Sequence, residues 1–220
     1  RLSEDPNSTV LLLEAGGSGD GFLATMPSGS AKLLGRPKTD WMYMTEPDPS
    51  LGGRKSMWFA GKMLGGGSSI NGMMYIRGSR ADYDSWEQDL GCTGWGWDSV
   101  QTYFKRSECF DGPASASHAT DGPMGVALPR KIHPLSHAFV DAFADLGYRK
   151  VEDYCAGDID GAFIAYVTQK NGQRSSAALA FLKPAMKRPN LTVITGAMVD
   201  KVLIEDGRAT GVQYVKDGET

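Results

Sequence analysis

The feature that most constrains this chain is a stretch of bare backbone in an apolar setting, the segment GKMLGGGSSINGMMYIRG at residues 61–78. A flexible linker would have polar flanks, whereas apolar residues flank these glycines. A Walker phosphate loop does not match either, because Gly66 is followed by Gly67 and Ser68 rather than by Lys and a hydroxyl residue. The segment therefore predicts backbone pressed close to a flat or anionic ligand, with amides or the hydroxyls of Ser68 and Ser69 donating hydrogen bonds to it.

Composition and charge favour a small-molecule partner. The 220 residues carry 23 basic and 26 acidic side chains, a net charge of −3, which gives no basic field for nucleic acid or an anionic membrane. Cys92, Cys109 and Cys155 include no CxxC pair, so we expect neither a disulfide framework nor a metal site. The sequence contains no apolar run of about 18 residues, the length that a transmembrane helix needs.

Three ordinary thiols suit a reducing compartment, so we expect a cytoplasmic protein. Because no initiator Met precedes Arg1, we also expect that sequence is missing at the N-terminus.

The run TVLLLEAGG at residues 9–17 predicts a strand buried on both faces of a parallel sheet. Dinucleotide-binding folds place an acid at the end of such a strand, where its carboxylate accepts hydrogen bonds from ribose hydroxyls, and Glu14 has that position. Any buried strand can also end in an exposed Glu. The glycine-rich phosphate turn of the dinucleotide motif would lie about 20 residues upstream, before Arg1, so the motif itself cannot be checked.

The rest of the chain alternates helical and extended patterns. Helical periodicity covers residues 80–91, 97–108, 133–148 and 174–188, the last interrupted at Pro184. Strands are predicted at residues 161–169 and 190–195, and a hairpin at 198–215 that turns at Asp206-Gly207. Residues 18–59 have little periodicity and predict a long ordered excursion. Residues 111–125 are a loop by composition and the best candidate for a domain boundary.

The motif GKMLGGGSSINGMMYIRGSRADYDSW, which covers the signature at residues 61–84, resembles that of the glucose-methanol-choline (GMC) oxidoreductases, flavoenzymes that oxidise alcohols with FAD. The similarity extends through VLLLEAGG, DWMYMTEPDP and GQRSSAALAFL, and the choline dehydrogenase-like branch is the most similar. The resemblance implies an α/β, Rossmann-like FAD-binding domain with an inserted substrate-binding segment, here incomplete. The cofactor domain would comprise residues 1–130 and 171–220, and residues 131–170 would be the substrate-domain segment.

The resemblance also implies which residues contact the cofactor. Glu14 would bind the adenosine ribose, the main chain of Val199 would meet the adenine, and Trp41 would lie near the flavin. The residues that would run along the cofactor and then against its isoalloxazine ring are Gly65, Gly66, Gly67, Ser68, Asn71, Gly72, Met73 and Met74. Some family members attach FAD covalently through a histidine immediately before the asparagine. That position is Ile70 here, which predicts non-covalent FAD.

No catalytic residue is predicted within the chain. The resemblance places the family's catalytic histidine, and its histidine or asparagine partner, beyond Thr220. His118 lies in the low-complexity loop, and His133 and His137 have i,i+4 spacing without the glutamate of an HExxH metal motif. We read that pair as a helix-start residue and a packing or surface residue. The isolated chain is therefore expected to be inactive.

The predicted function of the complete enzyme is hydride transfer from an alcohol carbon to FAD, with the electrons then passing to oxygen or to another acceptor. Two alternatives stay open at this point. One is a hydroxynitrile lyase of the same architecture, in which FAD is retained as a structural element. The other is a catalytically inactive fragment. Reduction of the flavin by an alcohol would separate the first alternative from the oxidoreductase.

Overall fold

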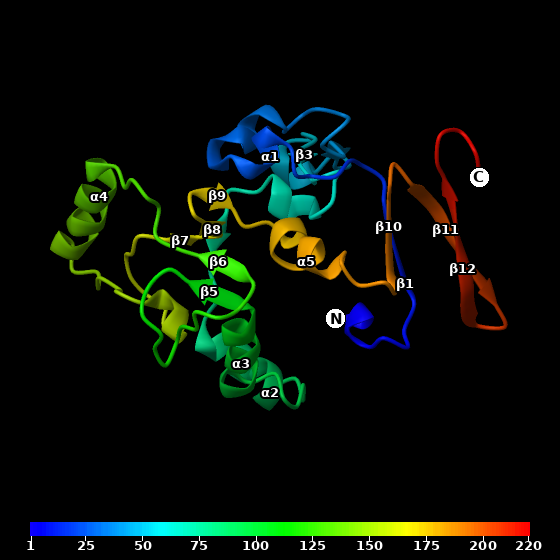
Figure 1. The fold of residues 1–220 in the computed structure, drawn as a ribbon. Helices are drawn as coiled ribbons and strands as arrows, with labels where there is room; N and C mark the ends of the chain where they lie inside the picture. The colour runs from blue at the N-terminus through cyan, green and yellow to red at the C-terminus, as the bar shows by residue number, and fades with distance from the viewer. The chain divides into compact units, whose positions relative to one another are not determined.

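The computed structural model describes all 220 residues, which form two compact units (Figure 1). The first unit comprises residues 1–72 and 176–220, and the second comprises residues 73–175. The sequence-based division, with an insertion only at 131–170, assigns more of the chain to the cofactor domain than these units do, and it stays a prediction about the family's domain organisation. None of the helices combines the length and apolarity needed to cross a bilayer.

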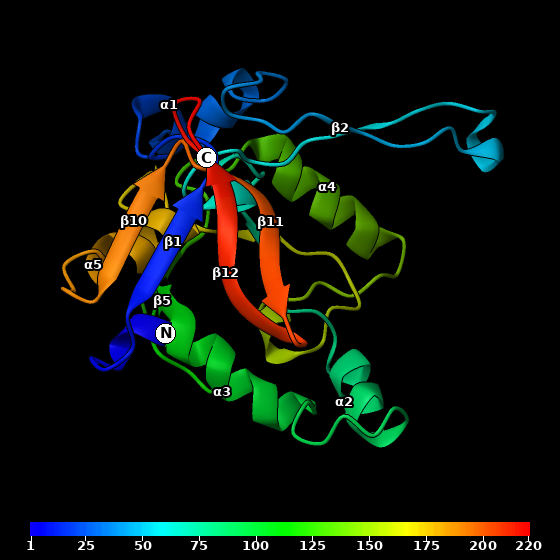
Figure 2. The same ribbon diagram turned by 90° about the vertical axis from the view of Figure 1, so that its right-hand side faces the viewer.

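The first unit contains a two-stranded parallel sheet. Strand β1 (Val10–Glu14) pairs with β10 (Leu191–Thr195), from Val10 opposite Leu191 to Glu14 opposite Thr195, and both views show the two strands side by side (Figures 1 and 2). The predicted strand is confirmed, but the prediction that both of its faces are buried is wrong. Leu11 is 50% exposed, because β1 has a single paired neighbour and no layer covers its outer face.

The predicted hairpin is confirmed. Strands β11 (Met198–Glu205) and β12 (Arg208–Val215) pair antiparallel, and β11 also contacts β1 in the first unit (Figure 2). Asp206 and Gly207 have φ angles of 48° and 75°, the positive values that a two-residue type I′ turn requires at both central positions. An Asp-Gly pair adopts this conformation at little steric cost, so the turn could be predicted from two residues.

Short elements complete the first unit. They are η1 (Leu2–Glu4), α1 (Phe22–Thr25), η2 (Pro27–Lys32), β2 (Tyr43–Met44), η3 (Pro49–Leu51), β3 (Met57–Trp58), η4 (Gly66–Ser69), η6 (Ala178–Leu182) and α5 (Lys183–Ala185). Ala24, Leu33, Met63 and Ile70 form its buried apolar cluster. The predicted helical segment changes at Lys183 from the π-helix η6 to α5, next to the predicted interruption at Pro184. Pro184 lies in the first turn of α5, where a missing amide hydrogen is tolerated.

The second unit contains three of the predicted helices and several short strand pairs. Its elements are β4 (Met74–Tyr75), α2 (Arg80–Gln88), α3 (Trp97–Ser107), β5 (Glu108–Phe110), β6 (Met124–Val126), α4 (Pro134–Asp145), η5 (Tyr154–Ala156), β7 (Tyr166–Val167), β8 (Gln169–Lys170) and β9 (Gln173–Arg174). Val126, Tyr154, Cys155 and Tyr166 form its core. His133 caps α4, where its Nδ1 accepts a hydrogen bond from the Leu135 amide at 3.2 Å, as expected for a helix-start residue.

The loop at residues 111–125, the predicted candidate for a domain boundary, does not separate the two compact units. It joins β5 to β6, which pair in parallel, and it lies wholly within the second unit. His118 in this loop is only 4% exposed, and its ring stacks on Phe110 with 3.8 Å between centroids. Composition could not reveal this packing, because it depends on partners from outside the loop.

Two distant segments of the first unit cross with almost no space between their backbones. The end of β1 leads to Gly17, whose carbonyl accepts a hydrogen bond from the Leu64 amide at 2.9 Å. One residue earlier, a Cβ on Gly16 would lie 1.7 Å from the carbonyl oxygen of Lys62. Only glycine fits at Gly16, whereas a Cβ on Gly17 would meet nothing within 4 Å.

This contrast predicts different outcomes for two adjacent substitutions. Gly16→Ala should lower the free energy of unfolding by about 3 kcal/mol, because the added methyl group must push apart two backbone segments. Gly17→Ala, the matched control, should change it by less than about 1 kcal/mol. Urea unfolding followed by circular dichroism measures both. Equal stability of the two variants would show that the crossing is not as tight as described.

Candidate functional site

Glu14 lies at the carboxyl end of β1, where the sequence predicted a ribose contact. Its Oε1 accepts a hydrogen bond from the Gly16 amide at 2.7 Å, and its backbone carbonyl accepts one from the Ala197 amide at 2.9 Å. The side chain is half-buried, and Oε2 has no hydrogen-bond partner in the structure. A carboxylate oriented through one oxygen keeps the other for donors such as the hydroxyls of a sugar.

The glycines of the 61–78 segment divide into two groups. Gly65 has a φ of 89°, and a Cβ there would meet Ser69 Oγ at 2.5 Å and Ala178 Cβ at 3.1 Å, so the fold itself requires this glycine. By contrast, a Cβ on Gly66, Gly67 or Gly72 would meet nothing within 4 Å, although the φ of 53° at Gly66 favours glycine. At Gly67 and Gly72 the fold needs glycine neither for space nor for a positive φ. Bare backbone facing open space is what close approach of a flat cofactor would require.

The two serines of this segment bond to the chain itself. Ser69 is fully buried and donates its hydroxyl hydrogen to the Leu64 carbonyl at 2.9 Å. The Ser68 hydroxyl donates to the Gly65 carbonyl at 2.5 Å and accepts from the Ala177 amide at 2.9 Å. The prediction that these hydroxyls donate to a ligand is therefore wrong for Ser69. For Ser68, the one hydroxyl hydrogen is already given to a backbone carbonyl.

The residues expected against the flavin ring differ in exposure. Asn71 is exposed, and its backbone amide donates a hydrogen bond to the Gly67 carbonyl at 2.8 Å. Ile70, at the position where some relatives carry a histidine, is 5% exposed and packs in the apolar cluster of the first unit. Met73 and Met74 belong to the second unit. Met73 is 8% exposed with a φ of 62°, whereas the Met74 side chain is 70% exposed.

Trp41 and Val199 complete the predicted cofactor set. The Trp41 ring stacks on Tyr43 at 5.8 Å, and Lys62 Nζ lies 4.9 Å from its centroid. The neighbouring Asp40 is 1% exposed. Burial raises the pKa of that carboxyl, but hydrogen bonds from three backbone amides lower it, and the pKa lies below its usual value. Val199 lies near the start of β11 and is 42% exposed.

Some of the residues predicted to bind the cofactor are therefore held close to one another by direct contacts. Hydrogen bonds and the backbone crossing hold the Glu14 end of β1 against Lys62, Met63 and Leu64, which lead into the glycines. Lys62 in turn contacts Trp41. No contact is described that joins Val199 to the glycines, so its place in the cofactor site stays a prediction.

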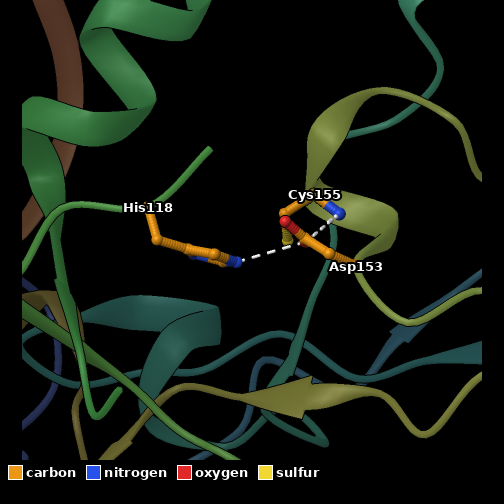
Figure 3. A group of neighbouring side chains, drawn as sticks. All are labelled: His118, Asp153 and Cys155. Atoms are coloured by element: carbon orange, nitrogen blue, oxygen red, sulfur yellow. Dashed lines mark hydrogen bonds and ion pairs between the residues drawn. The ribbon is translucent and has the colours of Figure 1, made fainter. Parts of the chain in front are cut away.

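A second constellation, which the sequence did not predict, lies in the second unit (Figure 3). His118 Nδ1 is 3.1 Å from both carboxylate oxygens of Glu108, and His118 Nε2 is 3.2 Å from Asp153 Oδ1. Arg77 Nη2 lies 2.9 Å from Glu108 Oε2, and both of these side chains are almost completely buried. The only sequence signal was an arginine flanked by apolar residues in the YIRG run.

The donor atoms of His118, Asp153 and Cys155 lie within 4.8 Å of one another, which raises the question of a metal site. Both ring nitrogens of His118 lie at hydrogen-bonding distance from carboxylates and are therefore already engaged. The Arg77 guanidinium balances the charge of Glu108. Burial raises the pKa of the Cys155 thiol to about 12, which disfavours the thiolate that a metal needs. The cluster is better explained as a structural network built around the buried Arg77–Glu108 ion pair.

The network also shifts the pKa of the Glu108 carboxyl. Burial raises the pKa of this carboxyl, but hydrogen bonds from His118 and the Ala119 amide and the charge of Arg77 lower it, and the pKa lies below its usual 4.5. Charged Glu108 therefore stabilises the folded state. This contribution is complete above the unfolded-state pKa and is lost as the pH falls through the folded-state value.

A substitution at Glu108 tests this account. Glu108→Gln should lower the free energy of unfolding at pH 7 by roughly 3–5 kcal/mol, because Arg77 is left buried without its countercharge. The control is Asp98→Asn, which removes the exposed partner of Arg80 at 2.9 Å and should cost less than about 1 kcal/mol. Urea unfolding of both variants and the parent chain gives the comparison.

The same substitution should change the pH dependence of stability. The difference in the free energy of unfolding between the parent chain and Glu108→Gln should become smaller as the pH falls below about 4.5. The reason is that the carboxylate of Glu108 in the parent chain becomes protonated there. Unfolding measured from pH 7 to pH 3 checks this. A difference that stays constant over the range would contradict the assigned role of the carboxylate charge.

Comparison with known proteins identifies the family. The family model for GMC oxidoreductases matches residues 12–220. The chain is 43% identical over 219 residues to an oxygen-dependent choline dehydrogenase of Rhizobium rhizogenes strain K84. The matched region covers 100% of this chain and 40% of that protein. It is 42% identical to the corresponding protein of Sinorhizobium fredii, over 99% of this chain and 39% of that protein.

Solved structures agree with the sequence comparison. Pyridoxine 4-oxidase from Mesorbium loti superposes with a TM-score of 0.92 at 33% identity, over 99% of this chain and 43% of that one. A formate oxidase from Aspergillus oryzae RIB40 superposes with a TM-score of 0.87 at 27% identity, over 100% of this chain and 40% of that one. The chain therefore spans about 40% of the length of the relatives it matches. The predicted mixed α/β cofactor-binding fold is confirmed, and the chain belongs to the GMC oxidoreductases, a family of FAD-binding flavoproteins.

Proposed function

We propose that the protein to which these residues belong oxidises a small alcohol, and that this chain supplies part of its FAD site. The observation that carries the proposal is that Gly67 and Gly72, in a chain of this family, are glycines although neither a positive φ nor a lack of space requires glycine there. FAD, when bound, supplies the redox chemistry by accepting a hydride from the alcohol carbon. The protein supplies binding, orientation and electrostatics.

The chain's own residues divide that work. Glu14 accepts hydrogen bonds from ribose hydroxyls through its unoccupied oxygen, and the Gly16 amide holds the carboxylate in orientation. Gly67 and Gly72 allow the backbone to approach the cofactor at van der Waals distance. The exposed Asn71 lies between them in sequence, and we place it against the flavin ring on the family resemblance. We place Trp41 beside the flavin and the Val199 main chain at the adenine on the family resemblance.

We further propose that FAD is held without a covalent bond. Ile70 has no nucleophilic atom, and its side chain is buried among Ala24, Leu33 and Met63. The position that carries the attaching histidine in some relatives therefore serves the apolar core here. One similar structure concerns FAD modification in formate oxidase, so the attachment mode needs a direct test in this chain.

The substrate class follows from what the relatives are named for. The matched proteins are choline dehydrogenases, a pyridoxine 4-oxidase and formate oxidases, whose donors are small and chemically different. We propose a small alcohol as donor and oxygen or another acceptor for the electrons. Residues 131–170 would contribute the first segment of the substrate domain. We propose no residue of this chain as the base that takes the alcohol proton.

A glycine substitution tests the cofactor site without disturbing the fold. Gly67→Ala should leave the melting temperature unchanged, because its Cβ meets no protein atom within 4 Å, and should weaken FAD binding at least tenfold by obstructing the cofactor. Gly21→Ala is the control, since a Cβ there also meets nothing within 4 Å. Equilibrium dialysis with FAD, read from flavin absorbance, gives both affinities. Equal FAD affinity in the two variants would overturn the placement of Gly67 at the cofactor.

The attachment mode has its own test. Acid precipitation of the flavin-loaded chain should leave all of the yellow colour in the supernatant, because no covalent bond holds it. Flavin absorbance that stays with the redissolved precipitate would contradict non-covalent binding.

A further inference from the structure

An aromatic cavity lies between α2 and α3 in the second unit. Its volume is about 590 Å³, within the range of roughly 300–1,000 Å³ typical of small-molecule sites. Its aromatic walls are Tyr83, Trp86, Trp95, Tyr103 and Phe104. Trp97 is fully buried, but Trp95 is 54% exposed, so it does not serve as a core residue.

The rings of this cavity meet at steep angles instead of stacking flat. Tyr83 and Trp86 have centroids 5.2 Å apart and an interplanar angle of 67°. Trp86 and Trp95 are 6.0 Å apart at 59°. Aromatic rings inclined in this way present faces and edges from several directions to the same cavity. Such a box suits a compact group that contacts more than one ring face at once.

The charge around the cavity favours a cation. The two helices and the segment between them, residues 80–107, contain five acids (Asp82, Asp84, Glu87, Asp89 and Asp98) and three bases (Arg80, Lys105 and Arg106), so their net charge is 3 − 5, or −2. Two of these carboxylates are fixed beside the cavity. Glu87 Oε1 accepts a hydrogen bond from the Gly94 amide at 2.7 Å, and Asp84 Oδ1 accepts one from the Trp97 amide at 2.9 Å. Neither bond neutralises the charge.

Two rings at this cluster already have cations close to them. The Arg106 guanidinium carbon lies 5.0 Å from the Tyr103 centroid, and that of Arg80 lies 5.5 Å from the Trp97 centroid. Both distances are within the range of about 6 Å for cation–π attraction. The exposed Trp86 and Trp95 have no such partner in the structure.

We propose that the α2–α3 cavity binds a quaternary ammonium group. The aromatic walls offer few hydrogen-bond acceptors, so a primary ammonium would lose its water without replacement. A quaternary ammonium has no N–H group to satisfy and spreads its charge over methyl groups that pack against ring faces. The surrounding carboxylates add long-range attraction. This inference does not rest on FAD binding or on the proposed alcohol oxidation.

The experiment titrates the 220-residue chain with tetramethylammonium chloride and follows tryptophan fluorescence at constant ionic strength. Saturable binding with a dissociation constant below roughly 10 mM is expected. The neutral probe tert-butanol, which has similar methyl groups and no charge, should bind at least tenfold more weakly. Equal binding of the two probes would show a merely apolar patch and overturn the proposal, as would the absence of saturation by tetramethylammonium.

Variants locate the site. Trp95→Leu should weaken tetramethylammonium binding about tenfold, because it removes one cation–π wall while changing an exposed residue. The matched control, Trp58→Leu, removes a tryptophan that is 65% exposed in the first unit and should leave the affinity unchanged. Circular dichroism verifies that both variants are folded. An unchanged affinity in Trp95→Leu, or an equal loss in both variants, would overturn the placement.

Discussion

The close crossing of two backbone segments is the constraint on which the first unit depends. Gly16, just past the end of β1, lies so near the Lys62 carbonyl that no side chain fits between them. The hydrogen bond from the Leu64 amide to the Gly17 carbonyl fixes the crossing. This contact brings the carboxylate of Glu14 to the start of the glycine-rich segment. The feature that holds the unit together therefore also assembles the proposed cofactor site, and a change in the crossing would affect both.

The second unit is organised around buried charge. Arg77, Glu108, His118 and Asp153 come from four separate segments and meet in one network of hydrogen bonds and ion pairs. Removing charges from water is costly, and such a network stabilises a fold only when every member is satisfied. Its role here is to fix the 111–125 loop against the core. His118 is thus explained by its structural contacts.

The features predicted correctly from the sequence are those set by local chemistry. The Asp206-Gly207 turn, the strand at the end of which Glu14 lies, and the helices α2, α3 and α4 follow from periodicity and from the conformational preferences of a few residues. The family could be identified because its motif is long. The buried hydroxyl of Ser69 and the packing of the loop around His118 could not be predicted, because they depend on how the fold packs segments together. Periodicity and composition carry no record of such contacts.

The central claim is that FAD lies along the backbone from Gly65 to Gly72, next to the end of β1. Hydrogen–deuterium exchange of the chain with and without FAD tests it most directly, because exchange reports on the backbone amides themselves. The account predicts slower exchange on adding FAD in peptides that cover residues 61–72 and 10–17, with no change in α2, α3 or α4. Protection confined to other segments, or no protection at saturating FAD, would contradict it.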